Sequence, residues 1–301
     1  MTKTYVGAAS PAVDAVSVAV APGEIYGLLG PNGSGKSTFV KMLVTLLAPT
    51  AGQAHVGGIS VTHEPRLVRS LIGVTLQDVG VDPVQSCHEL LVAQGRVSGL
   101  ARGPARDRAE ELLNALGLVD KIAARVSTLS GGQRRRLDLA LSLVHRPQVV
   151  FLDEPTTGLD PSSRRALWAE VRRLRDTGTT ILLTTQYLEE ADELADRIGI
   201  LKAGSLVAEG TARQLKERRG QHQVVLDLPD LDAALLVLDL DVAQRNDRQL
   251  IIDVEDAERS AVQILGRLTS AGVQVDRVRT ITPTLDDVFV AMTATDSERA
   301  A

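Results

Sequence analysis

The sequence lacks a second cysteine, an excess of basic residues and any long hydrophobic run. The single cysteine, Cys87, excludes an internal disulfide and fits a reducing compartment, and no Cys or His spacing around it suits zinc. The formal net charge is −5, and only six of the 33 basic residues are lysines. Because no basic excess is available for phosphate backbones, we expect no nucleic acid among the partners.

No stretch of this chain is apolar over the length that a membrane-spanning helix requires. The longest candidate, residues 231–242, is interrupted by Asp232, Asp239 and Asp241, whereas a spanning helix needs roughly 18 or more apolar residues. No signal peptide is visible. With 301 residues, 44% of them hydrophobic, the chain is long enough for one large globular domain and a small second one.

A glycine-rich loop lies between an apolar run, residues 25–29, and an apolar helical segment that is expected to begin near Lys36. The glycines allow backbone N–H groups to turn towards phosphate, the helix N-terminus adds positive charge, and the Lys36 ammonium reaches the terminal phosphates. Ser37 is expected to place its hydroxyl on Mg²⁺, with Thr38 beside it. The expected phosphate-binding residues are Gly30, Pro31, Asn32, Gly33, Ser34, Gly35, Lys36, Ser37 and Thr38.

Two adjacent acids follow a second short apolar run, residues 149–152, which is typical of a buried strand. Asp153 is expected to hold the metal through water, and Glu154 to orient and polarise the attacking water. Phosphoryl transfer depends mainly on positioning and on charge stabilisation. These two carboxylates, Lys36 and Mg²⁺ are therefore sufficient for ATP hydrolysis.

A second candidate phosphate-binding loop, residues 129–133, reads Leu-Ser-Gly-Gly-Gln and lies about a hundred residues beyond the first. One nucleotide needs only the first loop, so the second makes sense if it closes over a nucleotide held by another subunit. Ser130 also suits the N-cap of a helix beginning near Gln133, and both interpretations can hold because a helix N-terminus is an anion site. The residues expected to contact that nucleotide are Ser130, Gly131, Gly132 and Gln133.

These motifs, together with residues 151–155 and 158–160, resemble the nucleotide-binding subunit of an ABC transporter in order and spacing. The resemblance implies a head-to-tail dimer of two copies around ATP and Mg²⁺. It assigns Asp160 to the nucleotide site and Gln77 to contact with Mg²⁺ and with a membrane subunit. Tyr5 resembles the aromatic residue that stacks on adenine, although it could instead be a packing residue.

One position departs from the family pattern. Most ABC ATPases have a histidine that contacts the γ-phosphate, and here that position is Gln186. A glutamine amide can donate a hydrogen bond to phosphate, but it cannot carry charge or transfer a proton in the physiological range as imidazole can. We therefore predict hydrolysis that is slower, or less dependent on pH between 6 and 8, than in a histidine-bearing relative.

Gln186 also refines the resemblance, because together with residues 134–140 and 283–289 it is similar to the daunorubicin-resistance type of ATPase subunit. Such subunits belong to drug and lipid exporters. The resemblance implies a separate transmembrane permease and a peripheral location on the cytoplasmic face of the cell membrane. Residues 134–136, three arginines, are as well explained by a solvated helix face as by specific contacts.

The pattern of apolar residues predicts a parallel α/β core over residues 1–215, with strands around the phosphate loop up to residue 76. A mostly helical, transporter-facing subdomain is expected at about 78–128. Residues 221–295 predict a small α+β domain with strands at 224–226, 250–254 and 273–281. It lacks a catalytic cluster, so a role in dimerisation or regulation and a purely structural tail both stay open.

Two other classes of function are considered beside the exporter subunit. A soluble ABC ATPase acting on ribosomes, DNA or cluster assembly usually has tandem domains, a coiled-coil insertion or a basic face, and the sequence shows none of these. A weakly hydrolysing nucleotide switch is suggested by Gln186 alone. Glu154 argues against the switch, because the acid that would orient the water is intact.

Overall fold

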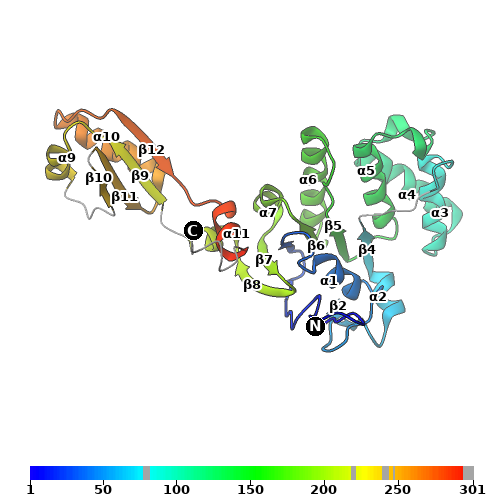
Figure 1. The fold of residues 1–301 in the computed structure, drawn as a ribbon. Coiled ribbons are helices and arrows are strands. Elements are labelled where there is room, and N and C mark those ends of the chain that lie inside the picture. The colour runs from blue at the N-terminus through cyan, green and yellow to red at the C-terminus, as the bar shows by residue number, and fades with distance from the viewer. Residues whose placement is uncertain (77–81, 218–221, 239–243, 247, 294–301) are drawn as a thin grey trace. The chain divides into compact units, whose positions relative to one another are not determined.

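The structure, a computed structural model, describes residues 1–76, 82–217, 222–238, 244–246 and 248–293. It divides the chain into two compact units, Met1–Ala212 and Arg213–Ala301 (Figure 1). Each unit has its own sheet and its own apolar core. The predicted fold class, an α/β core followed by a small α+β domain, is confirmed.

The first unit is built on a six-stranded sheet with the strand order β4-β5-β6-β1-β7-β8. Its strands are β1 (Ile25–Leu29), β4 (Ile72–Thr75), β5 (Val149–Asp153), β6 (Thr180–Thr185), β7 (Arg197–Lys202) and β8 (Ser205–Gly210). Neighbouring strands are parallel except β7 and β8, which pair antiparallel. The carboxyl ends of β1, β5 and β6 therefore meet at one edge of the sheet, where ligands bind in α/β folds.

Two apolar clusters cover the two faces of this sheet. Neighbouring residues of one strand, such as Val150 and Phe151, belong to different clusters, as the alternation of a strand requires. The first cluster includes side chains from α3 (Cys87–Val97), α4 (Arg102–Ala115), α5 (Gly131–Leu143), α6 (Pro161–Asp176) and α7 (Leu188–Leu194). The second includes side chains from α1 (Lys36–Leu43) and α2 (Pro65–Leu71) and from the short hairpin of β2 (His55–Val56) and β3 (Ile59–Ser60).

Several element boundaries differ from the sequence expectation. Helix α2 lies in a region where strands were expected apart from the helix that follows the phosphate loop; Pro65 occupies its first turn, where a missing N–H costs no hydrogen bond. Helix α5 begins at Gly131, two residues before the expected start, because Ser130 itself is the N-cap. Helices α3 and α4 confirm the mostly helical segment, joined to α5 through short 3₁₀ turns at Val119–Lys121 and Val126–Thr128.

The second unit contains a four-stranded antiparallel sheet with the order β10-β11-β9-β12. Its elements are α8 (Ala212–Glu217), β9 (His222–Asp227), α9 (Leu231–Leu238), β10 (Gln244–Asn246), β11 (Gln249–Val254), α10 (Ala257–Ser270), β12 (Arg277–Ile281) and α11 (Leu285–Thr293). Strand β12 starts four residues later than expected, because Gly272 first ends α10 with a left-handed turn. In the part of the chain that the structure describes, no helix meets the length and apolarity of a membrane span.

Candidate functional site

The loop after β1 forms a cradle in which Gly30 and Gly35 have no room for a side chain. Gly33 and Gly35 have φ values of 78° and 107°, in the left-handed region that glycine tolerates. A Cβ atom on Gly35 would lie 2.3 Å from the carbonyl oxygen of Ala12, so a side chain at this position would push the loop away from its support. The loop then enters α1, whose N-terminus presents free backbone N–H groups.

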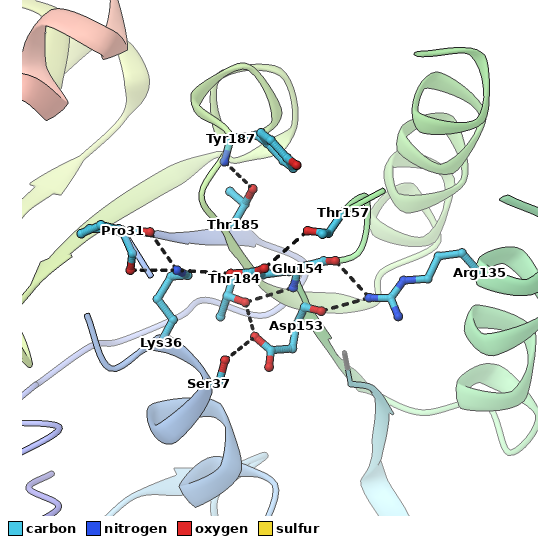
Figure 2. Close-up of polar contacts among 11 residues, drawn as sticks. Pro31, Lys36, Ser37, Arg135, Asp153, Glu154, Thr157, Thr184, Thr185 and Tyr187 are labelled. Atoms are coloured by element: carbon cyan, nitrogen blue, oxygen red, sulfur yellow. Dashed lines mark hydrogen bonds and ion pairs between the residues drawn. The ribbon is translucent and has the colours of Figure 1, made fainter. Parts of the chain in front are cut away.

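Lys36 is held inside this loop. Its Nζ donates to the carbonyl oxygens of Gly30, at 2.8 Å, and Pro31, at 3.2 Å, and lies 3.4 Å from Oε1 of Glu154 (Figure 2). The Lys36 and Glu154 side chains are only 4% and 8% exposed. A cation and the carboxylate of the residue that follows β5 therefore share one desolvated position, where charges act strongly on one another.

Asp153 ends β5 beside the hydroxyl of Ser37. Ser37 Oγ donates to Asp153 Oδ1 at 3.2 Å, and Thr184 Oγ1 donates a short hydrogen bond to the same oxygen. Asp153 and Thr184 are register partners of β5 and β6, which explains their contact. Hydroxyl and carboxylate oxygens are the ligands that Mg²⁺ prefers, so Ser37 and Asp153 fit the expected magnesium site.

The backbone of Glu154 is in the left-handed region, with a φ of 48°, which is uncommon for a residue with a side chain and costs about 1–3 kcal/mol. The Glu154 N–H donates to the carbonyl oxygen of Thr184 at 3.1 Å and to Thr184 Oγ1 at 3.2 Å. Its Oε2 accepts from Thr157 Oγ1 at 3.4 Å. The chain thus reverses at the end of β5 and turns the Glu154 carboxylate towards Lys36 (Figure 2).

Gln186 lies at the same edge of the sheet, directly after β6. The turn is closed by the Tyr187 N–H, which donates to Thr185 Oγ1 at 2.9 Å. A cavity of about 450 Å³ joins these groups, within the size range of small-molecule sites. Its lining residues are Ala12, Asn32, Gly33, Gly35, Lys36, Ser37, Thr38, Glu154, Thr157 and Gln186.

Tyr5, in the N-terminal segment, contacts Thr38, one of the residues that line this cavity. Its hydroxyl lies 3.3 Å from Thr38 Oγ1, and the ring is 44% exposed. An exposed aromatic ring beside the phosphate loop suits a stacking role better than a packing role, because a packing ring would be covered. Stacking on adenine stays a prediction.

Ser130, Gly131, Gly132, Gln133 and Asp160 are not among the residues that line this cavity. Ser130 caps α5 as predicted: its Oγ accepts from the Gln133 N–H at 3.3 Å, and Gln133 Oε1 accepts from the Ser130 N–H at 3.0 Å. Asp160 caps α6, and hydrogen bonds from Ser162 and Ser163 hold the pKa of its carboxyl well below the usual range. Gln77 lies outside the described residues.

Sequence reasoning missed Thr184, Thr157 and Arg135. The sequence offered an indication of Thr184: it lies near the end of β6, which runs parallel to β5, so its hydroxyl is opposite Asp153. Of the two interpretations of residues 134–136, the specific contacts are present: all three arginines donate to backbone carbonyl oxygens, although Arg134 is also exposed to solvent. Nothing in the residue types indicated those acceptors, since every residue carries a carbonyl.

The fold and site define a P-loop ATPase: a phosphate loop follows the central strand, and an acidic pair ends a nearby parallel strand. The protein-family model described as "ABC transporter" matches residues 13–157. The family model described as "ATP-binding protein DrrA1-3-like, C-terminal domain" matches residues 210–293. The Doxorubicin resistance ATP-binding protein DrrA of Mycobacterium tuberculosis is 45% identical, over 98% of this chain and 92% of that protein. The chain belongs to the ABC transporter family, in its DrrA-like group of ATP-binding proteins.

Two further similarities extend the comparison. The Nod factor export ATP-binding protein I of Rhizobium etli is 38% identical, over 99% of this chain and 93% of that protein. The dimeric structure of a bacterial ABC transporter cassette, at 27% sequence identity, superposes with a TM-score of 0.64 over 70% of this chain and 95% of that chain. The matched 70% of this chain corresponds in length to its first unit, Met1–Ala212, which is the length expected if the related cassette has no C-terminal unit.

Proposed function

We propose that this chain is the ATP-hydrolysing subunit of an exporter that moves a hydrophobic drug or lipid through a separate membrane permease. The observation that carries the proposal is the meeting of Lys36, Ser37, Asp153 and Glu154 at one edge of the sheet. The names of the relatives, which specify doxorubicin resistance and Nod factor export, favour an export role over the soluble or switch alternatives.

The chemistry assigned to the site is hydrolysis of the γ-phosphate of ATP. Bound Mg²⁺ would supply charge neutralisation on the phosphates, and Ser37 and Asp153 would hold it. Lys36 binds the terminal phosphates, and Gln186 donates an amide hydrogen bond to them. Glu154 orients and polarises the attacking water, because its carboxylate faces the cavity from the rigid end of β5.

The second loop is assigned to a second copy of the chain. Ser130 is exposed at the N-terminus of α5 and belongs to no part of the cavity around Lys36. In the proposed head-to-tail dimer, Ser130, Gly131 and Gly132 of one copy close over the ATP of the other. The dimeric structure of the related cassette supports this arrangement. The C-terminal unit is assigned a dimerisation or regulatory role.

The permease is expected at a cavity of about 1050 Å³ that α3, α5 and β4 border. Apolar side chains such as Leu90 and Val97 line it, and so does Asp138 of α5, which is only 7% exposed. Asp138 Oδ1 makes no hydrogen bond to any described residue. A buried carboxylate with one oxygen that receives no hydrogen bond favours a permease segment that brings a Lys or Arg among apolar residues. This docking would hold the chain at the cytoplasmic face of the membrane.

The test combines turnover with export. Purified chain should hydrolyse Mg-ATP, and Glu154→Gln should abolish turnover while calorimetry still detects ATP binding. Cells that express the chain with its permease should survive a hydrophobic drug that the Glu154→Gln cells do not survive. ATP turnover without any export or membrane recruitment by a co-expressed permease would instead favour a soluble ATPase.

A further inference from the structure

The three arginines after the second loop differ in what they reach. Arg134 Nη2 donates to the carbonyl oxygen of Val126, and Arg136 Nη1 donates to that of Leu116, at 3.3 Å and 3.0 Å. Both acceptors belong to the helical subdomain, and the arginines lie on α5, which follows it. Arg135 is the member of the triplet that crosses from α5 to the strands of the sheet.

Arg135 binds the end of β5 with most of its guanidinium. Its Nη2 donates to the carbonyl oxygens of Asp153, at 3.0 Å, and Glu154, at 3.1 Å, and its Nε donates to that of Pro155 at 2.8 Å. Its Nη1 donates to the carbonyl oxygen of Leu76, at 2.9 Å. One side chain therefore joins α5 to three consecutive carbonyl groups around the acidic pair and to the residue that follows β4.

One of these hydrogen bonds holds the unusual backbone of Glu154. The N–H of Glu154 is held by Thr184, and its carbonyl oxygen is held by Arg135. With a φ of 48°, this backbone needs support on both sides to keep its conformation. In Figure 2 Arg135 approaches the Asp153–Glu154 turn from α5, on the side opposite to Lys36.

The same helix begins with the second loop. Ser130 caps α5, and Arg135 lies five residues further along it. A helix is rigid over this length, because consecutive hydrogen bonds fix each turn. A tilt of α5 against β5 therefore changes the contacts of the Arg135 guanidinium with the Glu154 backbone.

We propose that Arg135 is a positioning residue for ATP hydrolysis, which holds Glu154 in its left-handed conformation and makes that conformation depend on the placement of α5. The second loop, assigned to the ATP of another copy, is thereby connected to the water-orienting carboxylate of its own copy. The inference rests on the proposed function, in that Glu154 orients the water.

The test compares Arg135→Ala and Arg135→Lys with Arg136→Ala in the purified full-length chain. Arg136→Ala is the matched control, because it removes a neighbouring arginine of α5 that also binds backbone carbonyl oxygens, those of Leu116 and Gly117, but none at the acidic pair. We expect Arg135→Ala to lower kcat at least about 10-fold, with ATP affinity by calorimetry within about 2-fold of wild type. Arg135→Lys should stay impaired, because one ammonium cannot span four carbonyl oxygens, whereas Arg136→Ala should keep most of the turnover.

Chemical rescue separates positioning from a merely structural role. Guanidinium chloride at a few millimolar, far below denaturing concentration, should restore part of the Arg135→Ala rate and none of the Glu154→Gln rate. If Arg135→Lys, which keeps the charge and folds, turns over ATP like wild type, the inference is overturned. The proposed function has its own readout: it fails if wild type and Glu154→Gln have the same turnover, and it survives if only the Arg135 result is negative.

Discussion

The two glycine-containing loops of this chain differ in how much of a binding site surrounds them. The loop before α1 faces a cavity with the buried Lys36. The carboxylates of Asp153 and Glu154, 2% and 8% exposed, lie at the end of β5. The loop before α5 presents Ser130 and Gly131 to solvent, with no charged side chain among residues 129–133. Its polar groups are satisfied locally by the capping box of Ser130 and Gln133.

The contrast shows which loop can work within one chain. Charged groups are buried only where a partner or a ligand compensates them, and the first loop has both a cation and carboxylates in contact. The second loop has backbone N–H groups and a helix N-terminus, but no buried charged side chain among residues 129–133. It therefore fits one side of a site that a second copy completes. The comparison predicts that damage at the two loops can be complemented between copies, because each composite site takes one loop from each copy.

The largest expected effect is that of Glu154→Gln. Because the variant keeps the shape but not the charge of the side chain, turnover should fall at least about 100-fold while ATP binding persists. Unhydrolysed Mg-ATP should then hold two copies together, which size exclusion with light scattering would show as a shift from monomer to dimer. ATP binding without that shift would mean that the two loops do not share a nucleotide in the isolated chain.

The next largest effect tests the loops against each other with Lys36→Met and Gly131→Asp. A Cβ atom on Gly131 meets nothing within 4 Å, so Gly131→Asp should fold, while its negative charge repels a phosphate brought by the other copy. Each variant alone should be almost inactive. An equal mixture should recover about a quarter of wild-type turnover, because half of the dimers contain one intact composite site.

The control for this mixture is each variant mixed with wild type, which calibrates the random pairing. Full turnover of Gly131→Asp alone would contradict the comparison, because it would show that hydrolysis does not use the second loop. Thermal unfolding of both variants checks that their loss of turnover is not a loss of fold.

The first loop and its acidic partners could be predicted because their signals are local. An apolar run of strand length before Gly30 and another before Asp153 fix two parallel strands, and the carboxyl ends of such strands meet. The capping box of Ser130 could be predicted for the same reason, since both members lie within one turn.

The support of Glu154 could not be predicted, because its parts carry no signal in residue type. A left-handed backbone is usually indicated by glycine, and here a glutamate adopts it. Arg135 binds carbonyl oxygens 18 to 20 residues away, and every residue offers such an acceptor. Only the packing of α5 against the end of β5 selects which carbonyls the guanidinium meets.

A smaller effect is expected from Gln186→His, which sharpens the description of the first loop. Gln186 lines the cavity with Lys36 and Glu154, so an imidazole there could contact the γ-phosphate with a charge that changes near pH 6.5. We expect turnover to rise several-fold and to become dependent on pH between 6 and 8. The measurement is kcat across that range, with Gln186→Ala as the control that removes the amide. An unchanged rate and an unchanged pH profile would show that this position does not act on the phosphate.

The smallest effect concerns Asp138, the buried carboxylate of the helix that the second loop begins. Unlike Asp153, which accepts two hydroxyl hydrogen bonds, Asp138 has an Oδ1 without a partner among the described residues. Burial raises the pKa of Asp138 from 3.8 to about 6, an effect that Arg135 and Arg134 partly offset. The folded state therefore binds this proton more tightly than the unfolded state. Below about pH 4 the carboxyl is neutral in both states and does not affect the free energy of unfolding. As the pH rises from about 4 to 6 that free energy falls, and above about pH 6 the charged carboxylate destabilises the fold by a constant amount.

Asp138→Asn removes that charge and should stabilise the chain by about 1–2 kcal/mol at pH 7.5, a few degrees in the midpoint of thermal unfolding. The gain should shrink between pH 6 and pH 4 and vanish below, because the wild-type carboxyl is then neutral as well. Asp107→Asn, at an exposed position of α4, is the control and should change the midpoint little at either pH. A gain of equal size at pH 4 and pH 7.5 would contradict a buried charge, since an uncharged contact would then explain the stabilisation. If the gain follows the predicted pH course, the same variant should weaken recruitment to a co-expressed permease, because a basic residue of the permease would have lost its carboxylate partner.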